Sequence, residues 1–153
     1  MKITQVVLIA ILTSYTLTAC AQAGNKNANS EMTDCENTEN TVSGMEEGVS
    51  GNWAWQKSVT QSRLAGGTVV DEDSRKGLKI HFSKDKTGIQ TDREGNQTPF
   101  SWSIIKNESQ NSFHINTEPN LFGNSELIVC DMQLKLLGSA FDGADNYFYK
   151  VSE

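Results

Sequence analysis

The segment GLKIHFSKDKTGIQ, residues 77–90, decides the fold class of this chain. Apolar and polar residues alternate from position 78 to position 83, so Leu78, Ile80 and Phe82 share one face of an extended strand. The turn-forming sequence DKTG at 85–88 follows, and the chain then continues as a second strand. That strand bears Ile89, Thr91 and Arg93. The segment therefore predicts a β-hairpin.

The same two-residue alternation recurs on both sides of the hairpin, in short runs separated by Gly, Asn and Asp clusters at roughly ten-residue spacing. One irregular loop, residues 61–77, contains a Gly66-Gly67 turn signal. The alternating positions of the other runs are Trp53, Trp55 and Val59; Phe100, Trp102 and Ile104; Phe113, Ile115 and Thr117; Leu127 and Val129; Leu134 and Leu136; and Tyr147, Tyr149 and Val151. Together with the hairpin, these runs predict about eight strands.

Residues 51–153 show no sustained helical periodicity with caps at both ends, so we expect hairpins to connect the strands. This pattern predicts an all-β fold: a small antiparallel up-and-down β-barrel of about eight strands, whose closure removes both sheet edges. A two-sheet sandwich of the same strands is the alternative, because the two folds share the alternation and differ only in closure.

The first twenty residues have the organisation of a bacterial lipoprotein signal. Lys2 provides the positive start, the apolar run VVLIAIL at 6–12 is too short to cross a bilayer, and LTAC at 17–20 fits a lipobox. We expect cleavage before Cys20 and attachment of lipid to its sulfur, which makes the membrane a partner of the mature chain. An ordinary signal peptide, with Cys20 as a thiol or in a disulfide, is the alternative. Because Ala21 and Gln22 lack the acidic residue linked to inner-membrane retention, we expect the outer membrane, at its periplasmic face or the cell surface.

Composition divides the chain into three parts. Residues 21–50 contain six acidic residues, one lysine and no aromatic, leucine or isoleucine side chain, a composition that cannot bury enough apolar surface to fold. All phenylalanines and tryptophans lie beyond Gly51. We therefore expect a signal peptide at 1–19, a lipidated acidic tether at 20–50 and a barrel domain at 51–153. The net charge of −6 and the lack of a basic stripe argue against nucleic acid as a partner.

Several stretches of the folded part resemble one protein family. The opening strand GNWAWQKS, the Gly66-Gly67 loop, LKIHFSKDKTG, LIVCDMQLKLL and the closing DGADNYFYKV are similar to the lipocalin-like domain lipoproteins of Bacteroidota. The likeness covers residues 51–153 and agrees with the LTAC signal. It implies a small barrel that binds a small hydrophobic ligand, without a specific chemical reaction.

Three cysteines are present, and lipidation of Cys20 leaves Cys35 and Cys130 as an even pair. In an oxidising compartment such a pair favours a disulfide, which would hold the tether against the barrel wall. Two alternatives stay open: Cys130 as a small apolar side chain, partly buried, and Cys35 as a free thiol in the tether.

Aromatic side chains carry the hypothesis of a ligand pocket, because most of them fall on the faces assigned to the barrel interior. These residues are Trp53, Trp55, Phe100, Trp102, Phe113, Tyr147 and Tyr149. They either line a pocket for a small apolar or amphipathic molecule or fill the barrel as its core, since side chains can fill an eight-stranded barrel.

Catalytic and metal-binding motifs are missing from the sequence, which has no nucleophile elbow, His-Glu-x-x-His helix, phosphate loop or Cys-x-x-Cys pair. His81 and His114 fall on strands that are not neighbours in a meander, so we do not expect a shared zinc site. The acidic run Asp71-Glu72-Asp73 lacks regular calcium-ligand spacing and indicates a solvated loop. We expect no catalytic residue, no metal and no cofactor, and therefore no enzyme.

The alternative function is a non-enzymatic interaction or scaffold lipoprotein with a filled barrel core and a protein partner in the cell envelope. Its sequence feature is an apolar stripe on the face opposite the assigned interior, either exposed or covered by the tether. The stripe consists of Ile128, Cys130, Met132, Leu137 and Phe148.

Overall fold

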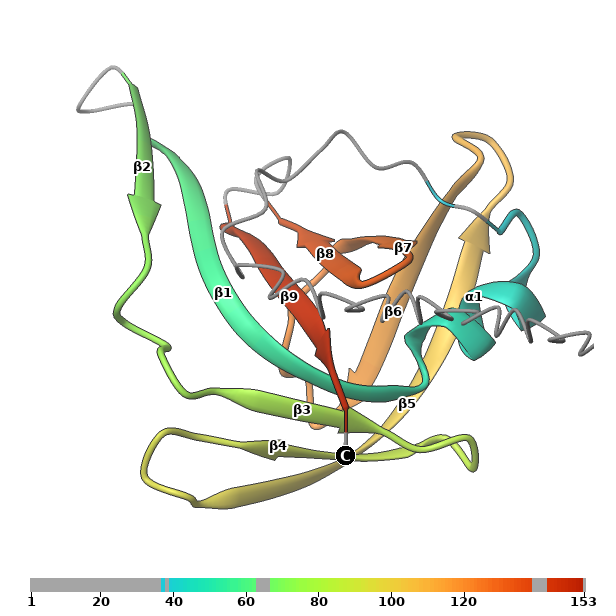
Figure 1. The fold of residues 1–153 in the computed structure, drawn as a ribbon. Coiled ribbons are helices and arrows are strands. Elements are labelled where there is room, and N and C mark those ends of the chain that lie inside the picture. The colour runs from blue at the N-terminus through green and yellow to red at the C-terminus, as the bar shows by residue number, and fades with distance from the viewer. Residues whose placement is uncertain (1–36, 38, 63–66, 139–142, 153) are drawn as a thin grey trace, which may run out of the picture. The chain divides into compact units, whose positions relative to one another are not determined.

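The computed structural model describes residues 37, 39–62, 67–138 and 143–152, and this part of the chain contains one short helix and nine strands (Figure 1). The elements are α1 (Val42–Val49), β1 (Gly51–Ser62), β2 (Gly67–Asp71), β3 (Lys79–Phe82), β4 (Thr87–Thr91), β5 (Gln97–Asn107), β6 (Ser112–Glu118), β7 (Glu126–Cys130), β8 (Gln133–Leu137) and β9 (Asp145–Val151). The expected signal peptide, Cys20 and Cys35 lie outside the described residues. Among the residues described, no helix has the length and apolar character needed to cross a membrane.

All nine strands belong to one antiparallel sheet with the order β2-β1-β3-β4-β5-β6-β7-β8-β9. The sheet closes on itself because β1 also pairs with β9, from Asn52 opposite Val151 to Val59 opposite Asp145. Strands β1 and β3 to β9 therefore form a closed eight-stranded barrel in which consecutive strands are neighbours. The prediction of a small all-β, antiparallel barrel is confirmed, and the β1–β9 ladder excludes the sandwich.

The β3–β4 hairpin forms where the sequence predicts it. At the turn, Oδ1 of Asp85 accepts hydrogen bonds from the amide of Thr87 at 3.0 Å and from its hydroxyl at 2.6 Å. Gly88 follows on the inner face, where a Cβ atom would lie 2.3 Å from Cζ of Phe100. Glycine at this position therefore lets the Phe100 ring enter the barrel, and Ile89, the next residue, points outward.

One apolar cluster fills the barrel interior. Its strand residues are Trp53, Trp55, Ile80, Phe82, Phe100, Trp102, Ile104, Phe113, Ile115, Leu127, Val129, Leu134, Leu136 and Phe148. The ring of Phe82 packs edge to face against both Phe100 and Trp102, with 5.5 Å between ring centroids in each pair. This geometry suits the charge distribution of aromatic rings. The alternation of β3 and β5 to β8 thus predicts their inward faces correctly. In β1 it does so for Trp53 and Trp55, but a register shift after Trp55 turns Ser58 inward in place of Val59, so the prediction for Val59 is wrong.

Helix α1 closes one end of the barrel and packs on β5 and β7. Met45 and Val49 lie one turn apart and are fully buried in the core cluster. The Trp53 indole donates a hydrogen bond of 2.7 Å to the carbonyl of Val49. An ion pair of 2.6 Å joins Glu46 to Lys86, in the turn that follows β3. The helix is therefore fixed to the barrel by apolar, polar and ionic contacts.

The loop between β6 and β7 closes the opposite end, beside Leu78 at the start of β3. Leu121 and Phe122 of this loop pack against the core cluster. The Phe122 ring lies 6.4 Å from Phe82 and 6.3 Å from Phe100, centroid to centroid. Apolar side chains therefore close both ends of the barrel.

Strand β2 is absent from the sequence prediction, which assigned its residues to an irregular loop. Thr68, Val69 and Val70 do not alternate in polarity, and all three are exposed. Because β2 covers no core, it carries none of the periodic signal by which the other strands were recognised. The expectation of about eight strands is correct for the barrel and one short for the sheet.

The inward face predicted for the last strand is wrong. Tyr147 and Tyr149 were placed inside with Val151, yet Phe148 is the buried residue and Tyr149 is 42% exposed. Phe148 pairs with buried Leu134 on β8 and is set opposite Trp55 on β1. Three consecutive aromatic residues fit either phase, so the neighbouring strands decide which side chain enters the core.

The folded part begins before Gly51, inside the segment 20–50 that composition assigned to a tether. Thr41 caps α1, with its hydroxyl accepting a 3.1 Å hydrogen bond from the amide of Gly44. The helix is poor in apolar residues, but Met45 and Val49 sit at the i and i+4 spacing that places both on one face. Counting aromatic, leucine and isoleucine residues missed this short amphipathic turn.

Candidate functional site

Five of the seven aromatic residues proposed to line a ligand pocket lie in the packed core. They are Trp53, Trp55, Phe100, Trp102 and Phe113. Each indole N–H is satisfied within the protein: Trp102 donates to the carbonyls of Ser83 and Thr87, and Trp55 donates to the hydroxyl of Ser58 at 3.2 Å. The arrangement is that of a hydrogen-bonded core, in which these rings contact other side chains.

The remaining two, Tyr147 and Tyr149, lie on the outer face of β9 and do not join the other five. Tyr147 is half-buried, and burial, followed by the charge of Asp145, raises the pKa of its phenol. The ammonium group of Lys57 lies 5.5 Å from the centre of its ring. The structure therefore brings together five of the proposed residues inside the barrel and leaves two outside it.

The two histidines occupy separate places, as their strands predicted. Nδ1 of His81 lies 2.7 Å from Oδ1 of Asn52 on β1, and Nε2 of His114 on β6 lies 3.4 Å from the hydroxyl of Ser112. In the ranges that the structure describes, no group of three or more His, Cys, Asp or Glu side chains is placed to hold a metal ion. In the acidic run, Oδ1 of Asp71 accepts hydrogen bonds from two backbone amides of its own loop.

The apolar stripe expected on the outer face of the last strands is broken up. Phe148 is inside the barrel and Cys130 is buried, whereas Ile128 and Leu137 are half-buried. Met132, in the β7–β8 turn, is 57% exposed. The prediction of Phe148 as an outward residue is wrong, for the register reason given above.

Asn37, before α1 in the chain, lies against β7. The side-chain amide of Asn37 donates to the carbonyl of Leu127 at 3.3 Å, and its Oδ1 accepts from the amide of Val129 at 2.8 Å. Strand β6 pairs with β7 only as far as Leu127, so Asn37 occupies the edge of β7 that β6 leaves uncovered. This contact is two residues after Cys35 and one residue before Cys130.

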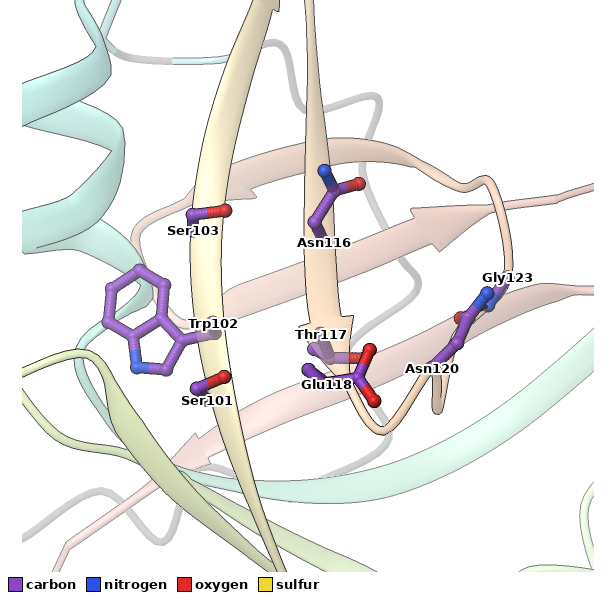
Figure 2. Close-up of a pocket in the computed structure, with 8 residues that line it drawn as sticks. All are labelled: Ser101, Trp102, Ser103, Asn116, Thr117, Glu118, Asn120 and Gly123. Carbon is purple, nitrogen blue, oxygen red and sulfur yellow. Dashed lines mark hydrogen bonds between the residues drawn. The ribbon is translucent and has the colours of Figure 1, made fainter.

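A hollow of about 450 Å³ lies on the outer face of β5 and β6 (Figure 2). We call it the β5–β6 groove. Its lining residues are Ser101, Trp102, Ser103, Asn116, Thr117, Glu118, Asn120 and Gly123. Ser101 is paired with Glu118 and Ser103 with Asn116 across the two strands. Four exposed polar side chains therefore stand as two adjacent cross-strand pairs.

The other lining residues shape the groove. Figure 2 shows the ring of Trp102 on the side of β5 away from the two serines. Thr117 turns to the β6–β7 loop, where its hydroxyl accepts a 2.9 Å hydrogen bond from the amide of Leu121. Oδ1 of Asn120 accepts a 2.8 Å hydrogen bond from the amide of Gly123 and so fixes the rim. The groove is thus a polar surface with a packed barrel wall behind it.

Four polar side chains of the groove, those of Ser101, Ser103, Asn116 and Glu118, have no partner in the described part of the protein. No side-chain hydrogen bond or ion pair joins them to another described group. Hydroxyl, amide and carboxylate groups set in two rows can accept and donate hydrogen bonds to a polar ligand. The sequence analysis missed this site, because the patterns Ser-x-Ser and Asn-x-Glu resemble any solvent-exposed strand face until the register aligns them.

Comparisons with protein-family models, with curated proteins and with solved structures find no match to this chain. The resemblance to lipocalin-like lipoproteins of Bacteroidota therefore stays a prediction from the sequence.

Proposed function

We propose that this chain is a lipid-anchored, non-enzymatic binding protein of the bacterial cell envelope. In this proposal the closed barrel is a rigid scaffold, and the β5–β6 groove binds a polyhydroxylated ligand such as a sugar chain. The observation that carries the proposal is the contrast between a filled interior and an outer groove in which four polar side chains face the solvent without partners among the described residues.

The packing supports binding at the outside over an apolar ligand inside. The barrel axis is occupied by large side chains, with Phe82 in edge-to-face contact with two other rings. Met45 of α1 and Phe122 of the β6–β7 loop add apolar side chains at the two ends. A ligand inside would have to displace well-packed groups, each worth roughly 2–5 kcal/mol when a large side chain is removed.

Sugar hydroxyls suit the groove because each one donates and accepts hydrogen bonds. The hydroxyls of Ser101 and Ser103 offer both roles, and the carboxylate of Glu118 accepts strongly. Because the Trp102 ring faces the core, the described lining offers no aromatic platform for a sugar ring. Each hydrogen bond makes a net contribution of only about 0.5–1.5 kcal/mol to binding, so we expect millimolar affinity for short sugars.

The binding test uses the full chain labelled with ¹⁵N and titrated with maltose, chitobiose and glucosamine. Binding in the groove shifts the backbone amide signals of residues 101–103 and 116–120. Glu118→Gln should weaken binding about five-fold, which corresponds to about 1 kcal/mol for a charge-assisted hydrogen bond at an exposed site. Glu72→Gln, which removes an exposed charge outside the groove, is the matched control and should leave affinity unchanged.

Two results would contradict this site. One is the absence of shifts in the groove at tens of millimolar sugar. The other is equal weakening by both glutamine variants, which would indicate a general charge effect. A change in tryptophan emission with fatty acids or quinones, lost in Trp102→Ala, would favour the apolar-ligand function instead.

The anchor rests on the LTAC motif, with Cys20 as the acylated residue. Cys20→Ser should abolish incorporation of labelled palmitate and move the chain from the membrane fraction to the soluble fraction, because the lipid chains provide the apolar burial that holds it. If the variant still fractionates with membranes as the wild type does, the lipoprotein proposal is wrong.

A further inference from the structure

The distal part of β1 leaves the barrel and forms an arm with β2. Strand β9 pairs with β1 only as far as Val59, whereas β2 pairs with β1 from Ser58 to Ser62. Beyond Val59, β1 therefore has β2 as its strand neighbour within the described residues. Figure 1 shows this pair of strands standing away from the rest of the sheet. We call it the β1–β2 arm.

The arm exposes apolar side chains on both of its faces. Val69 is 50% exposed and Val70 is 52% exposed, and as consecutive strand residues they point to opposite faces. Thr68 and Thr60 are exposed as well. A two-stranded ribbon with no core behind it is marginal in water, and three or more strands are needed for independent stability. Pairing with a further strand should therefore stabilise the arm.

The outer edge of β2 lacks lysine, proline and a β-bulge, and its one charged residue, Asp71, lies at its end. Lysine, proline and β-bulges protect natural sheet edges. Strand β2 has the sequence GTVVD, and its pairing with β1 runs from Gly67 to Asp71 without a register shift. In the barrel, the stretch of β7 that β6 leaves uncovered is occupied by Asn37. Among the described strands, the outer edge of β2 has no strand neighbour and is therefore the place where this sheet can accept another strand.

We propose that a second copy of this chain supplies that strand, by antiparallel pairing of the two β2 strands about Val69. In this register Val69 faces Val69 of the second copy, Thr68 faces Val70, and Gly67 faces Asp71. Two arms then join into a four-stranded ribbon, β1-β2-β2-β1, related by a two-fold axis. The same patch serves on both copies, as a two-fold interface requires.

Charge selects the antiparallel arrangement. The acidic run Asp71-Glu72-Asp73 follows directly after the paired residues. Parallel pairing would set the two runs side by side at about 4.8 Å, where like charges repel. In the antiparallel register Asp71 stands opposite glycine, and the two Asp71 residues are about 13 Å apart along the ribbon, beyond the Debye length of about 8 Å at physiological salt.

Because the interface is short, we expect a weak dimer, whose fraction rises with the local concentration of chains. Five residues of each β2 overlap in the proposed register. Proteins held on one membrane surface meet far more often than in solution. That gain depends on the lipid anchor of the proposed function, whereas the pairing itself does not.

The first test is disulfide trapping in the full chain purified in detergent. Opposed residues of an antiparallel pair lie about 4.5–5.5 Å apart at Cα, within reach of a disulfide. Val69→Cys should therefore give an oxidised dimer. Val70→Cys is the matched control, because two copies of residue 70 stand about 8 Å apart and cannot be bridged. We expect at least five-fold more dimer from Val69→Cys, with the oxidised wild type measuring the background from native cysteines.

Sedimentation of variants without new cysteines gives an independent readout. Val69→Lys places a charge on the pairing edge and should raise the dimer dissociation constant at least ten-fold. Ile105→Lys is its control, because Ile105 is equally exposed, at 51%, but lies on β5 away from the arm. Circular dichroism verifies that both variants keep their strands.

Three results would overturn the proposal. The first is a wild type that stays monomeric up to millimolar concentration. The second is equal cross-linking of the two cysteine variants. The third is Val69→Cys that forms, in intact cells, only adducts with the mass of another protein. The last result would assign the edge to a foreign strand. None of these results bears on Cys20 or on the groove, so a failure here is distinguishable from a failure of the proposed function.

Discussion

Replacement of Met45 by alanine tests whether α1 belongs to the folding unit of the barrel. Met45 is 1% exposed and lies in the core cluster with Val49. Truncation of a buried methionine costs about 2–5 kcal/mol, the sum of lost burial and the cavity that remains. An eight-residue helix with two glycines is not stable alone, so its docking is the source of its stability. We expect a loss of about 3 kcal/mol.

The assay is urea unfolding followed by tryptophan emission. Trp53 reports on the helix directly, because its indole donates to the carbonyl of Val49. With a slope of about 1.5 kcal/mol per molar urea, the midpoint of Met45→Ala should fall by about 2 M. Glu47→Ala, on the exposed side of the same helix, is the control and should stay within about 0.5 kcal/mol of the wild type.

A midpoint within 0.5 M of the wild type would refute this reasoning and restore residues 20–50 as a tether outside the cooperative fold. A loss of only about 1 kcal/mol in the free energy of unfolding, with a change in Trp53 emission before the main transition, would also contradict it. That result would mean that the helix undocks on its own, since the cost of a cavity cannot exceed the free energy of docking.

Two further predictions concern a covalent link and an acid-sensitive turn. Asn37 bonds to β7 and is two residues after Cys35 in the sequence, so we expect Cys35 to bond with Cys130, closing a loop of about 95 residues and adding about 4.5 kcal/mol before strain. Thiol counting on the unreduced chain that finds both thiols free would contradict this. The side-chain and then the backbone hydrogen bond from Asn96 to the carboxylate hold the pKa of Asp92 below its ordinary value. The stability that this carboxylate adds is present above the unfolded pKa of about 3.9 and lost as pH falls through the lower folded pKa. Asp92→Asn should therefore unfold at lower urea than wild type near pH 6. The two should unfold at the same urea once Asp92 of the wild type is protonated in both the folded and the unfolded state, whereas a constant difference at all pH values would exclude the charge as its cause.

The barrel is predictable from the sequence because most of its strands bury one face completely. In the β3–β4 hairpin, Ile80 and Phe82 alternate with polar residues, and the Asp85 turn has a local hydrogen-bonding reason to form. The alternation and the turn lie within ten residues of each other, so they can be recognised from a short stretch of sequence. Closure follows from the number of strands and the need to remove edges, and the β1–β9 ladder meets that expectation.

Features that depend on pairing between distant segments are not predictable in the same way. Phe148 enters the core because Leu134 and Trp55 stand opposite it, which a single strand cannot reveal. The β5–β6 groove depends on the register that sets Ser103 against Asn116. Strand β2 buries no side chain, and α1 buries only two side chains in eight residues. Neither element therefore has a pattern of apolar residues that distinguishes it from the flanking sequence.

Closure of the barrel by its first and last strands has a consequence for how the chain folds as it emerges. A chain that crosses a membrane from its N-terminus delivers β1 early and β9 last, yet Asn52 pairs with Val151. Until β9 arrives, the buried face of β1 with Trp53 and Trp55 stays exposed, and β8 is an open edge as well. Pairing of such distant residues is slow. The interval between the appearance of β1 and its pairing with β9 is therefore the stage at which this protein is most open to aggregation, and a chain cut short before Asp145 would remain in that stage.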